Sequence, residues 1–416
     1  MHKNTNHRPT LYVCLISDFT IANAQAILQF KPEEVIAIST PEMKSKAKGV
    51  EQRFERFLKS TQCIYRIWGS SDDSQESNTP PYAPFQAASA HETRRWIEDY
   101  LRPELERKRQ AGYILIANIT GGTKVASIAL HNGFKWDDIH YTAEAARGLL
   151  ETAQNESPTT LCSLPLSTEV HLLNDTIREV EDPWNDKDID SLLKCANIMH
   201  NDYLAPAKSK MLKSDKMLRD LWYNNMTPDK IQECHTVTLL NGRWYLPTSE
   251  IATFLSGFAD LHPDIKTEDN GGIILPASKE HPWVRFIAGI WWEHLVAAWA
   301  APLCREVQSN VVIDRELSTD NESDILVRTQ NNELRVIECK VEPPNAKGLK
   351  EIYNKLASSV PRFGKTKAAL MLSPVFFNRI SNEDAKTNFL DACAFRGIKI
   401  LQSKSDLENW LTDKRS

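Results

Sequence analysis

Short apolar runs that alternate with helical segments constrain the fold of this chain more than any other feature. Residues 11–16 read LYVCLI, residues 35–38 read VIAI and residues 114–118 read ILIAN. Runs of this length and composition are typical of strands buried on both faces of a sheet. Segments with a helical pattern lie between them, at about 21–30, 42–59 and 90–109. The alternation predicts a mostly parallel, doubly wound α/β domain over residues 1–160.

The last third of the chain combines strands and helices in a different order. A tryptophan-rich helical segment begins near residue 281, and two strand runs follow at 323–327 (SDILV) and 334–341 (LRVIECKV). The TQNNE turn between these runs suits a hairpin. A helix at about 347–359, a further strand and a final α/β pair come next. We expect a second α/β domain over residues 281–416.

The segment between these two domains, residues 161–280, has weaker patterns. It contains a helical, charged stretch at about 186–222, a hairpin-like stretch at 236–247 and a break at 268–272 (EDNGG). We expect a middle region made of helix and hairpin. Within it, the basic stretch 208–219 fits a solvated helix face, and the alternative is a contact with nucleic acid or with another domain.

Length and composition narrow the possible classes of protein. A chain of 416 residues is expected to form two domains. A net charge of −5 excludes a globally basic nucleic-acid coat but permits a local basic groove. The eight cysteines form no C-x-x-C pair, which argues against a zinc ribbon or redox motif. The N-terminal residues lack an apolar signal segment, and the longest apolar block carries Glu293 and His294, so we expect a cytoplasmic protein.

Two polar corners follow predicted strands of the first domain, at residues 17–20 (SDFT) and 118–124 (NITGGTK). Strand–helix corners of this kind form the usual ligand crevice of an open α/β sheet. Gly121 and Gly122 would let backbone N–H groups approach an anion, and Lys124 adds a cation at a helix N-terminus. The spacings of a P-loop and of a dinucleotide fingerprint are absent, so NAD is disfavoured. We predict a phosphate-bearing ligand; the alternative is a tight turn with an exposed lysine.

The second domain carries a candidate catalytic group on its hairpin. Asp324 opens one strand, and alternation places Glu338 and Lys340 on one face of the next, with Cys339 on the other. Charged side chains in an apolar strand are costly to bury unless they are compensated. The hard oxygens of Asp324 and Glu338 suit Mg²⁺ or Mn²⁺, while Lys340 could orient or help deprotonate an attacking water. The alternative is an intra-strand ion pair.

Further charged residues surround this group in the sequence. Glu293 lies in an otherwise apolar helical segment, either as a metal ligand or as a helix-surface residue beside His294. The tryptophans of that segment are expected in the core. A row of cations downstream predicts a phosphate track. It consists of Lys340, Lys347, Lys350, Lys355, Arg362, Lys365 and Lys367.

Both ends of the chain resemble one known family. SDFTIAN (17–23), STPEM (39–43) and NITGGTK (118–124) look like the ligand motifs of Rossmann-like CARF domains. GIWWE, ESDILV and IECK resemble the nuclease half of the same proteins, a restriction-endonuclease-like domain with the D…(D/E)-x-K signature. The combination resembles the CARF–nuclease effectors of type III CRISPR defence. The ligand residues assigned by the corners and the resemblance are Ser17, Asp18, Phe19, Thr20, Asn23, Thr40, Met43, Asn118, Thr120, Gly121, Gly122, Thr123 and Lys124.

The resemblance implies a homodimer that binds a cyclic oligoadenylate, most simply the tetra-adenylate, and then cuts DNA, RNA or both. It implies Glu293, Asp324 and Glu338 as ligands of Mn²⁺ or Mg²⁺, with Lys340 as the catalytic cation. The middle region and the polar loop at 70–85 depart from the family pattern.

Three other functions remain open at this stage. A CARF-type transcription regulator would bind nucleic acid without cutting it, so Asp324, Glu338 and Lys340 would have no task. A ring nuclease would degrade the cyclic oligoadenylate in its own binding site. A sugar-nucleotide enzyme would leave the hairpin signature unexplained.

Overall fold

The chain divides into two compact units, each of which is described by itself. Unit 1 comprises Met1–Ile177, Ile313–Asp320 and Arg362–Gly364, and unit 2 comprises Arg178–Val312, Asn321–Pro361 and Lys365–Ser416. The computed structural model describes residues 8–17, 20–45, 49–69, 84–85, 87–142, 149–154, 158–162, 164–173, 176–179, 189–204, 238–240, 243–246, 252, 255–258, 265–276, 285–314, 321–343, 346–359 and 367–412.

Unit 1 is built on a seven-stranded sheet in the order β3-β2-β1-β4-β5-β6-β7. The strands from β3 to β5 are parallel, while β6 and β7 join antiparallel. The strands are β1 (Thr10–Leu15), β2 (Glu34–Ile38), β3 (Ile64–Trp68), β4 (Ile114–Asn118), β5 (Asp138–Thr142), β6 (Leu149–Thr152) and β7 (Thr159–Thr160). The helices are α1 (Ile21–Phe30), α2 (Pro41–Lys44), α3 (Val50–Ser60), α4 (Ala90–Trp96), α5 (Arg102–Gln110), α6 (Lys124–Gly133) and α7 (Leu166–Leu173); the π-helical η1 (Ile97–Leu101) joins α4 to α5.

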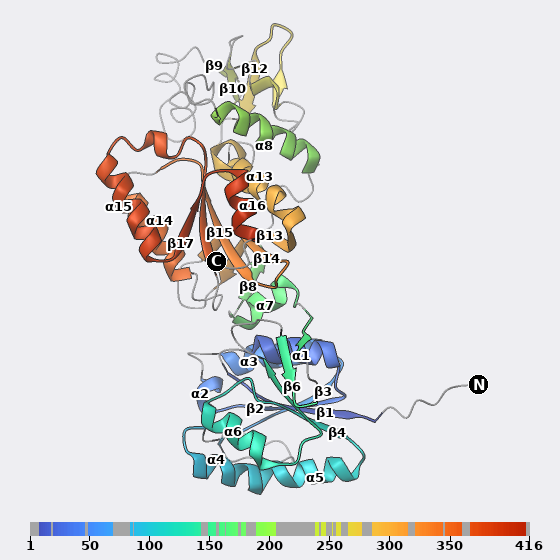
Figure 1. Ribbon diagram of the computed structural model, residues 1–416. Helices are drawn as coiled ribbons and strands as arrows, with labels where there is room; N and C mark the ends of the chain where they lie inside the picture. Colours follow the sequence, from blue (N-terminus) through green and yellow to red (C-terminus); the bar gives the residue numbers. More distant parts are fainter. Residues whose placement is uncertain are drawn as a thin grey trace, which may run out of the picture. The chain divides into compact units, whose positions relative to one another are not determined.

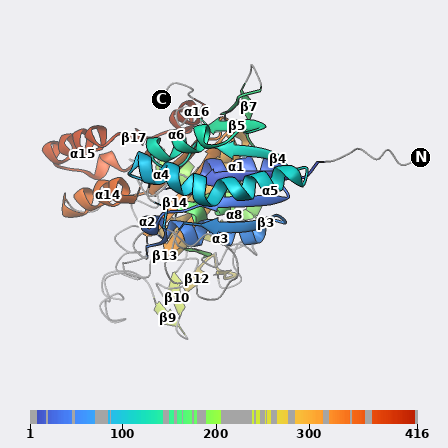
Figure 2. The ribbon, with the colours of Figure 1, turned by 90° about the horizontal axis from the view of Figure 1, so that it is seen from below.

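Helices cover both faces of this sheet, because successive residues of each central strand point to opposite sides. Tyr12 and Cys14 of β1 belong to a core that includes α1 and α3. Leu11 and Val13 belong to a second core with α4, α5 and α6. Figures 1 and 2 show α4, α5 and α6 together on one face of the sheet. The prediction of a doubly wound, parallel-rich α/β sheet is confirmed.

The strand order of unit 1 reverses direction at β1. The chain runs outward from β1 to β2 and β3, then returns to place β4 on the other side of β1. Helices after β1 and after β4 must therefore leave toward opposite faces. The carboxyl ends of these two strands form the topological switch point at which open α/β sheets bind ligands.

Unit 2 is built on a six-stranded sheet in the order β17-β16-β15-β14-β13-β8. Strands β14 and β15 form an antiparallel hairpin, while β15, β16 and β17 run parallel. The strands are β8 (Thr176–Glu179), β13 (Cys304–Asp314), β14 (Asn321–Thr329), β15 (Leu334–Lys340), β16 (Lys367–Leu372) and β17 (Ile398–Leu401). The helices around the sheet are α13 (Trp291–Ala300), α14 (Ala346–Ser359), α15 (Glu383–Phe395) and α16 (Lys404–Thr412), with short turns η3 (Phe286–Ile290), η4 (Ala301–Leu303) and η6 (Phe377–Arg379).

One face of the β14–β15 hairpin packs against the tryptophan-rich helix α13. Trp291 and Trp292 are fully buried and share a core with Ile337, Cys339 and residues of α16. The indole of Trp292 also donates a hydrogen bond of 3.0 Å to the Met371 carbonyl of β16. Helices α14 and α15 lie on the other side of the sheet (Figure 1). The expected hairpin, and the core position of these two tryptophans, are confirmed.

The remaining described part of unit 2 contains α8 (Ile189–Tyr203), which packs against α13, and a small antiparallel sheet. That sheet has the order β11-β12-β10-β9, with β9 (Thr238–Leu240), β10 (Arg243–Leu246), β11 (Lys266–Thr267) and β12 (Ile273–Pro276). The expected hairpin at 236–247 is therefore present as β9 and β10. The basic stretch 208–219 lies outside the described residues. The loop 70–85 does so too, apart from residues 84–85.

The helical pattern at 42–59 corresponds to two helices, α2 and α3. Thr40 caps α2 by accepting a hydrogen bond from Met43 N at 3.3 Å, and Pro41 begins the helix. Helix α3 starts after Gly49, which has the left-handed φ of 54°. No helix in the described part of the chain is long and apolar enough to cross a membrane.

A buried ion cluster links β2 to its neighbours in unit 1. Glu34 is 3% exposed and accepts hydrogen bonds from Lys108 of α5 and Arg66 of β3. We expect Glu34→Ala to lower the free energy of unfolding by about 3 kcal/mol, because the buried Lys108 side chain would lose the carboxylate that pairs with it. The exposed pair Glu55–Lys59 provides the control, and Glu55→Ala should cost less than about 1 kcal/mol. Equal losses in denaturant titrations would contradict a structural role for the cluster.

Candidate functional site

The first corner of the crevice in unit 1 lies between β1 and α1. The side chain of Asn23 is fully buried, and its Nδ2 donates a hydrogen bond of 2.8 Å to the Leu15 carbonyl at the end of β1. Thr20 is buried at the N-cap of α1, and Ser17 is half-buried. Asn23 therefore fixes the angle at which the helix leaves the strand. Asp18 and Phe19, two predicted ligand residues, lie outside the described residues.

The second corner lies between β4 and α6, beside the first. Asn118 is fully buried at the end of β4, and its Oδ1 accepts hydrogen bonds from Thr120 N (2.9 Å) and Thr120 Oγ1 (2.6 Å). Thr120 Oγ1 in turn accepts a bond of 2.8 Å from Thr142 N at the end of β5. These bonds hold the shape of the turn. The sequence analysis missed Thr142, although it ends the run DIHYT at the same edge of the sheet.

Glycine is needed at two positions of this turn for different structural reasons. A Cβ on Gly121 would lie 2.3 Å from the Leu15 carbonyl oxygen, so only glycine lets the turn approach β1 this closely. Gly122 has a left-handed φ of 80°, which favours glycine. Gly121 is buried, whereas Gly122 is exposed. Together they bring the two predicted corners side by side at the switch point.

The start of α6 presents exposed polar groups at this position. Thr123 caps the helix by accepting a hydrogen bond from Ala126 N at 3.2 Å, and its hydroxyl donates to the Ala87 carbonyl at 2.7 Å. Lys124, the first residue of the helix, is exposed. The positive end of the helix dipole and the lysine ammonium both favour an anion here. This arrangement can bind a phosphate group.

The third predicted ligand motif follows β2, the neighbour of β1 on its other side. Thr40 is half-buried, and its hydroxyl oxygen caps α2 as described above. Met43 is half-buried and packs against the core that contains α1 and α3. Because β2 is parallel to β1, this motif lies at the same edge of the sheet as the two corners.

The second candidate site lies on the hairpin of unit 2. Asp324 is 6% exposed and Glu338 is 4% exposed, so both carboxylates are buried. Lys340 Nζ lies 2.7 Å from Glu338 Oε1 and 3.4 Å from Asp324 Oδ2. The Cys339 backbone N–H also donates to Asp324 Oδ2 at 2.6 Å. The structure therefore brings together three of the four predicted catalytic residues, and the ion pair considered in the sequence analysis is part of this group.

The ionisation of this group reflects its burial. Burial and the neighbouring Glu338 raise the pKa of Asp324 to about 6, against the opposing effect of Lys340. Burial lowers the pKa of Lys340, but Asp324 and Glu338 outweigh it and raise that pKa above its usual value. One lysine therefore does not fully compensate two buried carboxylates.

The fourth predicted residue, Glu293, lies on α13. This helix packs on β14 and β15 against the face that carries Ile337 and Cys339, whereas Glu338 projects from the opposite face. After burial and Asp324, the charge of Glu293 also raises the pKa of the Cys339 thiol, which places Glu293 near this strand. Its role as a ligand stays a prediction.

A second lysine reaches the carboxylate pair from α14. Lys355 Nζ lies 3.6 Å from Glu338 Oε1, and its side chain is 46% exposed. Lys355 belongs to the row of cations noted in the sequence. Of that row, Lys350 is exposed on the same helix, whereas Arg362 and Lys365 lie outside the described residues. Among the described members, Lys347, Lys350 and Lys355 lie on α14, and Lys340 belongs to the carboxylate group itself, whereas Lys367 lies at the start of β16.

The donor set of the pair fits a divalent metal ion. Asp324 and Glu338 supply hard carboxylate oxygens, and their incompletely compensated burial would be relieved by added positive charge. Among the described residues, no group of three or more His, Cys, Asp or Glu side chains is arranged to hold a metal ion. Within the described part of the chain, a metal ion would therefore have two carboxylate ligands, Asp324 and Glu338.

The whole chain is similar in fold to two solved structures. One is the crystal structure of protein VC1899 from Vibrio cholerae, at 18% identity and a TM-score of 0.61, over 97% of this chain and 96% of that one. The other is Can2 from Sulfobacillus thermosulfidooxidans in complex with cyclic tetra-adenylate, at 20% identity and a TM-score of 0.60, over 97% of this chain and 98% of that one. No family model and no curated protein sequence matches the chain.

The raised pKa of Asp324 predicts how stability depends on pH. The folded protein holds this proton up to about pH 6, while the unfolded chain releases it near pH 4, so stability falls as pH rises through this interval. We expect the stability advantage of Asp324→Asn over the wild type to grow by about 3 kcal/mol from pH 4 to pH 7, measured by urea unfolding in EDTA.

The exposed Asp391 of α15 provides the matched control for this pH experiment. The difference between Asp391→Asn and the wild type should stay within about 1 kcal/mol over the same interval, because an exposed carboxylate is solvated in both states. The contradicting result is a difference in the free energy of unfolding between Asp324→Asn and the wild type that does not change with pH. It would show that burial does not raise the pKa of Asp324 in the folded protein.

Proposed function

We propose that the chain is a metal-dependent endonuclease of type III CRISPR defence, activated by a cyclic oligoadenylate that binds to unit 1. One observation carries the proposal. This chain has the fold of Can2, a protein solved in complex with cyclic tetra-adenylate, and its own hairpin buries Asp324 and Glu338 beside Lys340. A sensor alone has no need of such a costly group.

The crevice of unit 1 suits the proposed activator. Its exposed parts are Gly122, Thr123 and Lys124, at a helix N-terminus that favours phosphate. It has no P-loop spacing, so we infer a ligand that is bound and not consumed as fuel. A cyclic ligand with repeated phosphates matches a two-fold symmetric pair of such corners, and we therefore propose a homodimer.

The catalytic roles follow from the contacts in unit 2. Asp324 and Glu338 would hold Mg²⁺ or Mn²⁺, which supplies Lewis-acid stabilisation of charge on the phosphate. Lys340 contacts both carboxylates, so its ammonium is positioned to stabilise developing negative charge and to orient a water. The Cys339 N–H keeps Asp324 in place. Glu293 is proposed as a further ligand from α13.

Other features of the proposal come from the sequence. The division into a sensing domain at 1–160, a middle region at 161–280 and a nuclease domain at 281–416 stays a prediction, as does a cytoplasmic location. The proposed substrate is DNA, RNA or both. Activation would be a population shift, in which the ligand binds the cutting-competent state more tightly than the resting one.

Paired variants test the separation of sensing from cutting. We expect Asp324→Asn and Glu338→Gln to lower cleavage of plasmid DNA or single-stranded RNA at least 100-fold while cyclic tetra-adenylate binding changes less than twofold. Lys124→Ala should weaken that binding about tenfold and spare any ligand-free cutting. Cleavage with Mn²⁺ and binding by calorimetry measure the two properties.

Three results would contradict this assignment or favour an alternative. Full cleavage by Asp324→Asn would remove the hairpin from the active site. Loss of cyclic tetra-adenylate itself, during incubation without other substrate and unchanged in the hairpin variants, would indicate a ring nuclease acting in unit 1. Metal-independent binding of DNA without cutting would favour a transcription regulator.

A further inference from the structure

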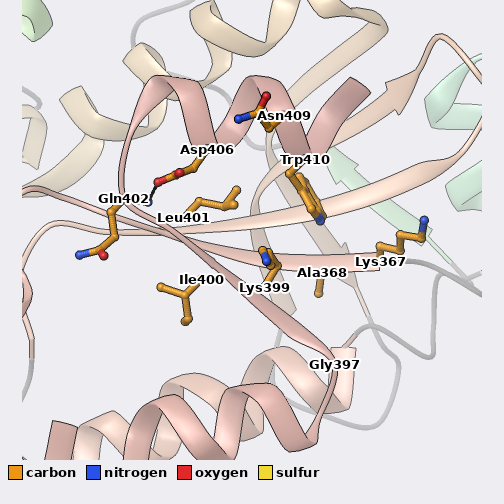
Figure 3. A pocket seen from close by; sticks show the side chains of 10 residues that line it. All are labelled: Lys367, Ala368, Gly397, Lys399, Ile400, Leu401, Gln402, Asp406, Asn409 and Trp410. Atoms are coloured by element: carbon orange, nitrogen blue, oxygen red, sulfur yellow. Dashed lines mark hydrogen bonds between the residues drawn. The ribbon is translucent and has the colours of Figure 1, made fainter. Parts of the chain in front are cut away.

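A cavity in unit 2 lies away from the carboxylate pair. It has a volume of about 680 Å³ and lies between the edge strand β17, its neighbour β16 and helix α16. Figure 3 shows Lys367 and Lys399 on the two strands, with Asn409 and Trp410 across from them on α16. Gln402 and Asp406 complete the polar part of its lining.

The sheet register separates this cavity from the candidate catalytic group. Lys367 pairs with Arg335 at the start of β15, whereas Lys340 pairs with Leu372 at its end. Five residues of strand separate the two levels, or about 16 Å. Lys367 also shares the sheet face of Arg335, Ile337 and Cys339, and Glu338 points to the other face. The cavity is therefore a different site.

The same register brings the two lysines of the cavity together. Lys399 pairs with Ala369, two residues after Lys367, so both ammonium-bearing side chains leave the same face on adjacent strands. Their Cα atoms lie about 8 Å apart from strand geometry. Two cations at this spacing create a positive potential that favours an anion.

Nearby acidic groups only partly offset this charge. Glu333 Oε2 lies 3.5 Å from Lys367 Nζ and also contacts the buried Arg335 guanidinium. Asp406 Oδ2 accepts a hydrogen bond of 3.0 Å from the Gln402 backbone N–H, at the start of α16. Lys399 is exposed, and no ion pair of it occurs within the described residues. Lys399 is therefore the more available cation.

The rest of the lining matches a larger group than a simple anion. A single phosphate would occupy only a small part of about 680 Å³, a volume in the usual range of small-ligand sites. The amides of Gln402 and Asn409 offer donors and acceptors, as the edges of a nucleobase require. Leu401 and Trp410 are both buried and form the apolar base of the lining.

We propose that this cavity binds a phosphate-bearing nucleotide unit, with Lys367 and Lys399 contacting the phosphate. The unit has two possible sources, a free mononucleotide or one nucleotide of a single strand. The inference does not depend on the activity of the carboxylate pair, because the two sites lie on different faces of the sheet.

The test uses the full chain with Asp324→Asn, so that no strand is cut, and titrates it with AMP and with a 5′-phosphorylated twelve-nucleotide thymidine strand. We expect Lys367→Gln/Lys399→Gln to weaken binding of at least one probe about tenfold. For the strand, the slope of log Kd against log salt should fall by about 1.4. Lys399→Arg should retain most of the affinity because it keeps the charge.

The control removes two lysines outside the cavity, Lys386 of α15 and Lys404 of α16, as the double glutamine variant. This control variant should change the affinity for AMP and the affinity for the thymidine strand by less than twofold. Loss of AMP binding in the cavity variant identifies a free nucleotide as the source, and loss of strand binding alone identifies a strand. The proposal is overturned if neither probe is affected, or if the control loses as much as the cavity variant. Unchanged thermal unfolding of the variants would exclude misfolding as the cause.

Discussion

The burial of two carboxylates, which Lys340 and the more distant Lys355 compensate only in part, is the constraint on which the proposed chemistry of unit 2 depends. Asp324 and Glu338 are nearly inaccessible, and Lys340 and the Cys339 N–H are the groups that hold Asp324. Such a group destabilises the fold at neutral pH, as the raised pKa of Asp324 shows. The fully buried tryptophans of α13 and the parallel strands behind the hairpin supply the rigid support that keeps these charges in place.

Unit 1 shows the opposite arrangement, because its polar groups mostly hold backbone and leave the end of the crevice exposed. Asn23 and Asn118 are buried and bind the strand ends and the turn, while Lys124 faces solvent. The sequence motif thus combines residues that shape the turn with residues available to a ligand. In the proposed function, the phosphate-binding corner of unit 1 and the buried acidic group of unit 2 would be the two parts that ligand binding couples.

Much of this architecture could be predicted from sequence, because the central strands β1, β2 and β4 of the first sheet are buried on both faces and read as mostly continuous apolar runs. The hairpin could be predicted for a similar reason, since Glu338 and Lys340 interrupt such a run with period two. The bond from Thr142 to Thr120 could not, because it depends on strand order. The cavity beside Lys367 and Lys399 could not be predicted either, because the parallel register brings together residues 32 positions apart (399 − 367 = 32).

The most direct test of the account is cleavage by the wild-type chain with Mn²⁺, on plasmid DNA and single-stranded RNA, with and without cyclic tri-, tetra- and hexa-adenylate. The account predicts that one ring, the tetra-adenylate, increases the cleavage rate at least tenfold and that EDTA abolishes cleavage. Cleavage at the same rate with and without every ring, or no cleavage under any combination, would contradict it.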